Sequence, residues 1–148
     1  MIQNSDQPIP QGTYVPAARH ADLIYTSGMT PRKTGKLLYS GRISASDPPE
    51  SHRDAVCLAT FNALLAARAC LQDGEKLSVI LRLTVFINAE PEFTAHSKIA
   101  DYASETLIEH LGPGSIGSRA AVGVASLPAN APVEITLIGS VASQVSRD

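Results

Sequence analysis

Apolar residues alternate with polar ones, or recur every three to four positions, in several stretches of the chain, and these stretches predict its elements. Two short strands are expected over residues 13–18 and 22–27, with a turn at residues 19–21 between them. Residues 77–89 alternate most regularly and predict the longest strand. The face of this strand that is expected to pack on helices consists of Leu77, Val79, Leu81, Leu83, Val85 and Ile87.

Two helices are predicted from apolar residues at helical spacing. The first begins near Ser51, which forms an approximate capping box with Asp54, and Gly74 suits the left-handed position beyond its end. The second runs from about residue 97 to residue 111 and is ended by Gly112.

The remaining stretches complete the predicted topology. Residues 30–50 contain five glycines and prolines and predict a long surface loop, with a short strand near residues 37–39. Residues 118–141 predict two apolar strands joined by a Leu-Pro turn. This order of elements indicates an α+β fold with a single β-sheet and two helices on one face. No predicted helix remains for the opposite face, so we expect a homo-oligomer that covers it.

Composition and charge narrow the class of protein. With 148 residues, 44% apolar and 18% charged, the chain fits one globular domain over residues 1–148, with flexible ends at 1–11 and 143–148. A formal net charge of −2 without a basic run disfavours a strong nucleic-acid binder. The N-terminus lacks the regions of a signal peptide, no stretch is apolar enough to span a membrane, and Cys57 and Cys70 are too far apart for a disulfide. A cytoplasmic location is therefore expected.

Arg119 and Glu134 are isolated charges on the two apolar strands of residues 118–141, since no Lys, Arg, Asp, Glu or His lies between them. A guanidinium there offers a planar fork of donors for a carboxylate or phosphate. If the two strands pair, both side chains point into one pocket. The alternatives are a structural ion pair between them, or exposure of both to solvent, and sequence spacing leaves these readings open.

Other candidate residues carry weaker signals. Ser27 and Gly28 place a hydroxyl and an open backbone where a ligand can approach, although a turn serine commonly caps its own backbone. Tyr14 can direct its hydroxyl into a cleft or lie half-buried on a strand. The four histidines have no metal-binding spacing and nucleotide-binding motifs are missing, so we expect neither a metal nor a cofactor.

Three stretches resemble a known family. GSRAAVGVASLPANAPVEITLIG, at residues 117–139, resembles the C-terminal signature of the RidA/YjgF family, the endoribonuclease L-PSP type. YTSGMTP at residues 25–31 resembles the family's Ser-Gly-x-x-Pro segment, and LRLTVFINAEPEF at residues 81–93 resembles its central strand. The resemblance implies a chorismate-mutase-like fold, a homotrimer with a central barrel, and a ligand cleft between subunits.

The resemblance also implies an activity. Its best-understood members hydrolyse reactive enamine or imine intermediates to 2-keto acids and ammonia without a cofactor, while others are described as endoribonucleases or translation inhibitors. By this resemblance, Arg119 binds the substrate carboxylate and Glu134 orients or activates the hydrolytic water. The residues implied to bind substrate are Tyr14, Ser27, Gly28 and, through its backbone, Ala121.

Two positions differ from the characterised deaminases. Where those proteins commonly carry cysteine and often glutamate, this chain has Ala121 and Gly123, which indicates a divergent branch. We expect a deaminase-type hydrolase of small imines that associates with itself. The alternatives are a non-catalytic module that binds small carboxylates, and an endoribonuclease or translation inhibitor, which the lack of a basic patch disfavours.

Overall fold

The computed structural model describes residues 6–144, which form a five-stranded sheet in the order β1-β2-β7-β5-β6. The sheet is antiparallel except between β5 and β6, which run parallel. Its strands are β1 (Ala17–His20), β2 (Leu23–Thr26), β5 (Glu75–Asn88), β6 (Ile116–Val124) and β7 (Val133–Ser143). A separate hairpin pairs β3 (Arg32–Lys33) with β4 (Lys36–Leu37).

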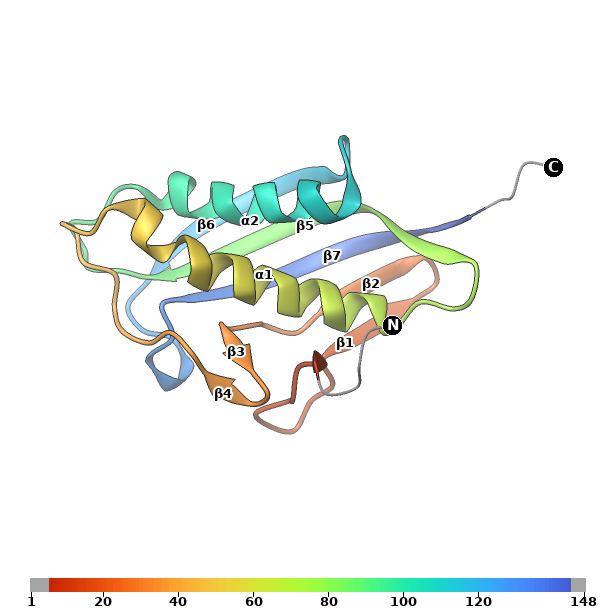
Figure 1. The fold of residues 1–148 in the computed structure, drawn as a ribbon, viewed down its shortest axis with the longest axis horizontal. Helices are drawn as coiled ribbons and strands as arrows, with labels where there is room; N and C mark the ends of the chain where they lie inside the picture. Colours follow the sequence, from red (N-terminus) through yellow and green to blue (C-terminus); the bar gives the residue numbers. More distant parts are fainter. Residues whose placement is uncertain (1–5, 145–148) are drawn as a thin grey trace.

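Two helices cover one face of the sheet. Helix α1 (Arg53–Arg68) and helix α2 (His96–Leu111) lie side by side over this face, as Figure 1 shows. Two short 3₁₀ turns, η2 (Pro49–His52) and η3 (Pro128–Asn130), precede α1 and β7. The predicted α+β architecture, with one main sheet and both helices on the same side, is confirmed.

The core lies between the helices and the sheet, and two irregularities in β5 decide which of its residues enter it. The pairing of β5 with β7 shifts register between Leu77 and Ile80 and again between Ile80 and Arg82. Ile80 is therefore buried, while Leu81 is 43% exposed. The predicted strict alternation from residue 77 to residue 87 was wrong in this segment, because bulges change the facing of a strand.

The first two strands and the start of α1 differ from prediction. Strand β1 begins at Ala17, directly after Pro16, and Arg19 belongs to the strand rather than to the turn. Ala21 makes the turn with a left-handed φ of 52°. The predicted capping box was wrong as well, because His52 occupies the N-cap position without a side-chain cap and the Ser51 hydroxyl donates to the carbonyl of Pro48.

The region predicted as a long loop contains the β3–β4 hairpin and is fastened to α1. The Asn62 amide nitrogen, from the middle of α1, donates to the carbonyls of Thr30 at 3.1 Å and Arg32 at 2.8 Å. Asn62 is buried, so both bonds are shielded from water. This contact fixes the segment that follows β2 against the helix.

The sheet face opposite the helices carries no covering element among the described residues. Tyr25, Phe86, Val122 and Ile138 share this open face by their register, and all remain partly or largely exposed. No helix in the described part of the chain is long and apolar enough to cross a membrane. Of the predicted flexible ends, residues 1–5 and 145–148 lie outside the described residues.

An ion pair between two largely buried side chains, Arg19 and Glu75, joins three parts of the fold. The Arg19 guanidinium donates to both oxygens of Glu75, at 2.6 and 2.8 Å, and to the carbonyl of Cys70 at 3.1 Å. It thereby links β1, the segment after α1 and the start of β5. The hydrogen bonds from Arg19, together with the backbone N–H of Gln72, lower the pKa of Glu75 from its ordinary value of 4.5 to about 2.

We expect this pair to stabilise the fold in a pH-dependent way. Because the folded-state pKa of Glu75 is depressed, its contribution is present above about pH 4.5 and is lost as the pH falls towards about 2. Melting temperatures of the native chain and of Glu75→Gln should differ at pH 7 and converge as the pH falls through that interval.

Glu105→Gln is the matched control, because Glu105 is 3.6 Å from Arg53 and both side chains are more than half exposed. This variant should melt close to the native chain throughout. A difference between Glu75→Gln and the native chain that stays constant from pH 7 to pH 2.5 contradicts the assignment.

Candidate functional site

Arg119 projects from β6 towards the helices and is held by α2. Its Nη1 donates to Asp101 Oδ1 at 2.8 Å and to Ser104 Oγ at 3.1 Å. Its Nη2 donates to Ser97 Oγ at 2.9 Å and, at 3.4 Å, to the Ser97 carbonyl. The guanidinium is thus oriented by one face of α2 while its side chain stays 25% exposed.

Arg119 and Glu134 do not share a pocket within one chain. Strand β5 lies between β6 and β7, so the last two strands do not pair and the condition for a shared pocket is not met. Arg119 is in register with Leu83, which faces the helices, whereas Glu134 is in register with Phe86, which faces the open side. The two charges therefore lie on opposite faces of the sheet. They form no ion pair, and Arg119 is paired with Asp101 instead.

Glu134 is a half-buried carboxylate packed against backbone. A Cβ at Gly28 would lie 2.6 Å from its Cδ, so only glycine leaves room for the carboxylate in this position. Glu134 takes part in none of the ion pairs between described residues. Burial raises its pKa above the ordinary value, because the charged form has lost water without gaining a cation. A carboxyl group in this state can give and take a proton nearer to neutral pH.

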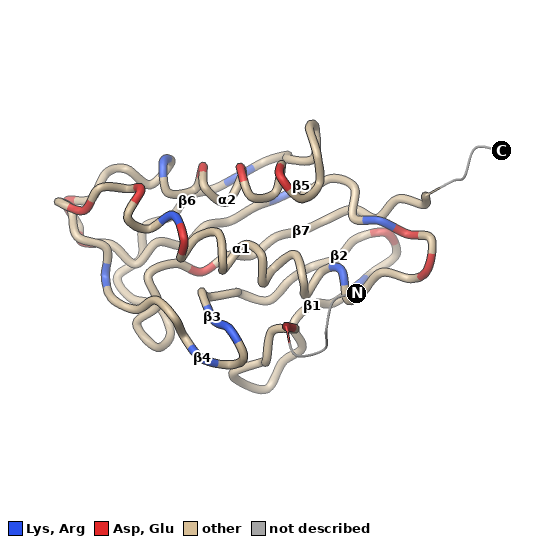
Figure 2. Tube along the Cα trace, viewed as in Figure 1, with Lys and Arg blue, Asp and Glu red and all other residues tan. Residues whose placement is uncertain are grey.

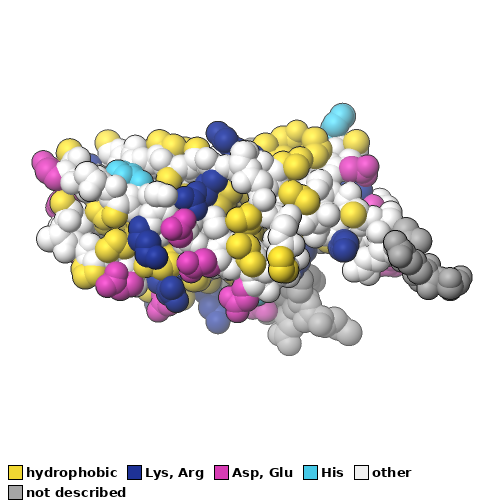
Figure 3. All heavy atoms as spheres, turned by 90° about the horizontal axis from the view of Figure 1, so that it is seen from above, with side chains coloured by type: hydrophobic (Ala, Val, Ile, Leu, Met, Phe, Trp, Pro, Cys, Tyr) yellow, Lys and Arg dark blue, Asp and Glu magenta, His cyan; other side chains and the backbone are white. Residues whose placement is uncertain are grey.

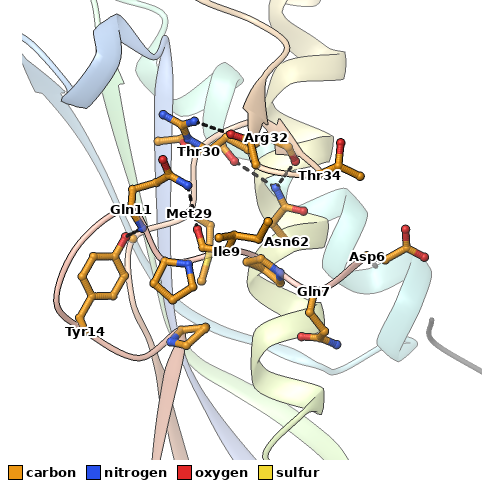
Figure 4. A pocket seen from close by; sticks show the side chains of 15 residues that line it. Asp6, Gln7, Ile9, Gln11, Tyr14, Met29, Thr30, Arg32, Thr34 and Asn62 are labelled. Atoms are coloured by element: carbon orange, nitrogen blue, oxygen red, sulfur yellow. Dashed lines mark hydrogen bonds between the residues drawn. The ribbon is translucent and has the colours of Figure 1, made fainter. Parts of the chain in front are cut away.

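The segments beside Gly28 form a small cavity under the N-terminal arm. Residues 6–11, Tyr14 and the segment after β2 enclose about 40 Å³, with Asn62 at its base (Figure 4). Tyr14 is 47% exposed and its hydroxyl accepts a hydrogen bond from the backbone N–H of Gln11 at 3.1 Å. The Ser27 hydroxyl donates to the carbonyl of Val15 at 2.6 Å, which holds the arm against β2.

These contacts divide the predicted site residues into two groups. Glu134 and Gly28 are in contact, and Gly28 shares the cavity with Tyr14. Ser27 is bonded to the backbone of the arm. The second group is Arg119 with Ala121, which is in register with Val85 on the helix-facing side of β6 and packs against the core.

Three residues that contact Arg119 were not predicted from the sequence. Ser97, Asp101 and Ser104 follow one another at spacings of four and three, so they form a polar stripe on one face of α2. This spacing is visible in the sequence. It becomes informative only once α2 is known to lie beside β6.

Charges of both signs are distributed over the surface. In Figure 2 acidic residues recur along α2 while the β3–β4 hairpin carries basic ones, and on the face seen in Figure 3 the two signs lie interspersed. Strong electrostatic binding of nucleic acid requires a contiguous basic surface. The face seen in Figure 3 carries no such contiguous basic surface.

The α+β fold, with two helices on one face of a mixed sheet, defines the class of protein, and a family model identifies the family. The model described as endoribonuclease L-PSP matches residues 4–141. The chain belongs to this family, and the resemblance to RidA/YjgF proteins is confirmed.

Solved structures agree with this assignment. The protein Atu1372 of unknown function from Agrobacterium tumefaciens is 32% identical, with a TM-score of 0.81 over 92% of this chain and 86% of that one. E. coli TdcF, solved with bound serine, is 23% identical, with a TM-score of 0.67 over 95% and 97% of the two chains. The E. coli YjgF gene product is 22% identical, with a TM-score of 0.67 over 94% and 96%. The last two show the fold alone.

The contact between Gly28 and Glu134 makes the acidity of the carboxyl group testable. In Gly28→Ala the new Cβ displaces the carboxyl group, and we expect its pKa to fall towards the ordinary value as the group gains water. NMR titration of the Glu134 side chain measures this shift.

The contribution of Glu134 to the free energy of unfolding should depend on pH in the opposite direction to that of Glu75. Because the pKa of Glu134 is higher in the folded than in the unfolded state, the protein loses stability as the pH rises from the unfolded-state pKa through the folded-state pKa. Gly28→Ala should reduce this loss. Gly12→Ala is the control, since a Cβ there meets only the Tyr14 ring, at 3.3 Å. An unchanged Glu134 pKa in Gly28→Ala contradicts the packing described.

Proposed function

We propose that the protein is a cofactor-free hydrolase that deaminates reactive enamine or imine intermediates of small carboxylates to 2-keto acids and ammonia. The observation that carries this proposal is the Glu134 carboxyl group, half-buried against Gly28 with a raised pKa. An imine is already electrophilic, so its hydrolysis requires a positioned water and a proton-transferring group more than a strong nucleophile. In this proposal Glu134 orients and deprotonates that water.

The substrate carboxylate is assigned to Arg119. Its guanidinium is oriented by Ser97, Asp101 and Ser104, which engage Nη1 and Nη2, and its side chain remains a quarter exposed. In this proposal the carboxylate binds at the remaining Nε–H and replaces the 3.4 Å bond from Nη2 to the Ser97 carbonyl. Serine, the molecule bound in the TdcF structure, is a small amino acid with a carboxylate of this kind. Ala121 is assigned to the same end of the site, where its backbone groups contact the ligand.

A complete site in this proposal requires two copies of the chain. Arg119 and Glu134 lie on opposite faces of one sheet, so one substrate can reach both only if they come from different subunits. The partly exposed apolar residues of the open face support self-association, because such residues favour burial in a contact. A homotrimer with clefts between subunits satisfies both requirements, and Tyr14, Ser27 and Gly28 are assigned to the Glu134 side of each cleft.

The family description raises a second activity, cleavage of RNA. The interspersed charges of the face seen in Figure 3 and the net charge of −2 do not favour it. The rate at which the purified protein degrades RNA is therefore a useful control in the test below.

The test generates 2-aminoacrylate in situ with a pyridoxal-phosphate-dependent dehydratase and follows pyruvate release with and without the protein. We expect release faster than the spontaneous rate. Arg119→Ala should lower kcat/KM about 10- to 100-fold, the equivalent of one charge-assisted pair, and Glu134→Gln should lower kcat. Arg53→Gln is the control, because Arg53 is exposed and its guanidinium contacts Glu105 and the ring of Tyr102 rather than any residue assigned to the site.

Two outcomes decide against hydrolysis. Release at the spontaneous rate, with 2-ketobutyrate or serine still raising the melting temperature through Arg119, identifies a module that binds small carboxylates without turnover. Release at the spontaneous rate with RNA degradation that Glu134→Gln abolishes identifies a ribonuclease.

A further inference from the structure

A second cavity adjoins the Arg119 side of the site. It has a volume of about 310 Å³ and lies between the end of β6 and the segments that carry Arg42, Glu90 and His96. Arg119, Ala121 and Gly123 all face the helices, because they are in register with Leu83, Val85 and Ile87 in turn. Alternate residues of a strand are about 7 Å apart, so the row leads from Arg119 into this cavity.

His96 forms one wall of the cavity because residue 123 is glycine. A Cβ at Gly123 would lie 2.6 Å from His96 Nε2, so any larger residue displaces the imidazole. The ring stands edge-on to the buried Phe93, with 5.2 Å between centroids and an angle of 70° between planes. Its orientation is thus set by packing, and among residues 6–144 neither of its ring nitrogens has a hydrogen-bond partner.

The opposite wall supplies a cation. The Arg42 Nη2 donates to the carbonyl of Ala125 at 2.6 Å, which leaves most of the five N–H donors of its guanidinium for a ligand. The acid in the cavity, Glu90, already accepts hydrogen bonds from Ala45 N at 2.9 Å and from Ser44 Oγ at 3.3 Å. Both of these bonds end on Glu90 Oε2 and tie that carboxylate to the segment of Ser44 and Ala45, so the N–H donors that face the cavity come from Arg42 and His96.

The cavity and Arg119 meet at the first turn of α2. The Arg119 guanidinium is bonded to the side chain of Ser97, the residue that follows His96. A ligand whose carboxylate is held by Arg119 therefore has a second set of donors within the same part of the site. This geometry suits a molecule with an acceptor group at each end.

We propose that the cavity of Arg42 and His96 binds the distal carboxylate of the substrate, so that the preferred substrates are four- or five-carbon 2-imino dicarboxylic acids and the products are 2-keto dicarboxylic acids. This proposal rests on the proposed function and specifies its substrate class. Arg42 and His96 are specificity-determining residues in it, and Gly123 makes the room that His96 occupies.

Binding of the products to the full-length chain provides the test. Isothermal titration compares pyruvate and 2-ketobutyrate with oxaloacetate and 2-ketoglutarate. The native chain should bind the dicarboxylates at least tenfold more tightly, as expected for one additional charge-assisted hydrogen bond. Arg42→Gln should lower this ratio about tenfold, and Gly123→Ala should lower it by displacing His96.

Two surface variants serve as controls. Arg53→Gln removes an exposed arginine from the start of α1, and His110→Gln removes an exposed histidine from the other end of α2. Both should keep the native ratio. Arg42 is itself exposed, so its variant should fold, and circular dichroism checks Gly123→Ala.

The outcomes separate this proposal from the one on which it rests. If Arg119→Ala weakens all four ligands while the native chain binds mono- and dicarboxylates equally, the carboxylate site stands and the substrate class is wrong. A preference for dicarboxylates that Arg42→Gln leaves intact also overturns the role of the cavity. If Arg119→Ala weakens none of the four ligands, the Arg119 site itself is wrong and this proposal fails with it.

Discussion

The position of β5 between β6 and β7 is the constraint on which the candidate site depends. Its parallel pairing with β6 and its antiparallel pairing with β7 fix the facing of every side chain on both neighbours. A shift of one residue in either pairing would move Arg119 or Glu134 to the other face of the sheet. The separation of the two charges is therefore a property of the whole sheet and not of two adjustable side chains.

The two charges are stabilised by different means, and this difference suits different roles. Arg119 is surrounded by oxygen acceptors on α2, so its orientation is fixed while it stays charged. Glu134 is half-buried and has no cation beside it among the described residues, so its charged form is energetically costly. A residue that only holds the fold together is usually compensated, as Glu75 is by Arg19. The uncompensated burial of Glu134 is thus better explained by function than by stability.

Much of the fold was predictable, because long helices and strands show a clear period of apolar residues in the sequence. The limits of β5, α2 and the last two strands were close to those observed, and the family signature was legible in residues 117–139. The bulges in β5 were not predictable, because this part of the strand carries apolar residues on both faces and a register shift leaves no mark in the sequence pattern. For the candidate site, the sequence singled out Arg119 and Glu134 as isolated charges. The sheet faces on which they lie depend on long-range strand order, which spacing along the chain does not contain.

Asn62 gives the helix layer a part in the chemistry of the open face. Its two hydrogen bonds hold the backbone of Thr30 and Arg32, and the same segment presents Gly28 to the Glu134 carboxyl group. The backbone that buries the Glu134 carboxyl group on one side of the sheet is therefore held in part by an amide on the other side. A substitution at Asn62 that loosens this segment would therefore change the burial, and with it the acidity, of a carboxyl group that Asn62 does not contact.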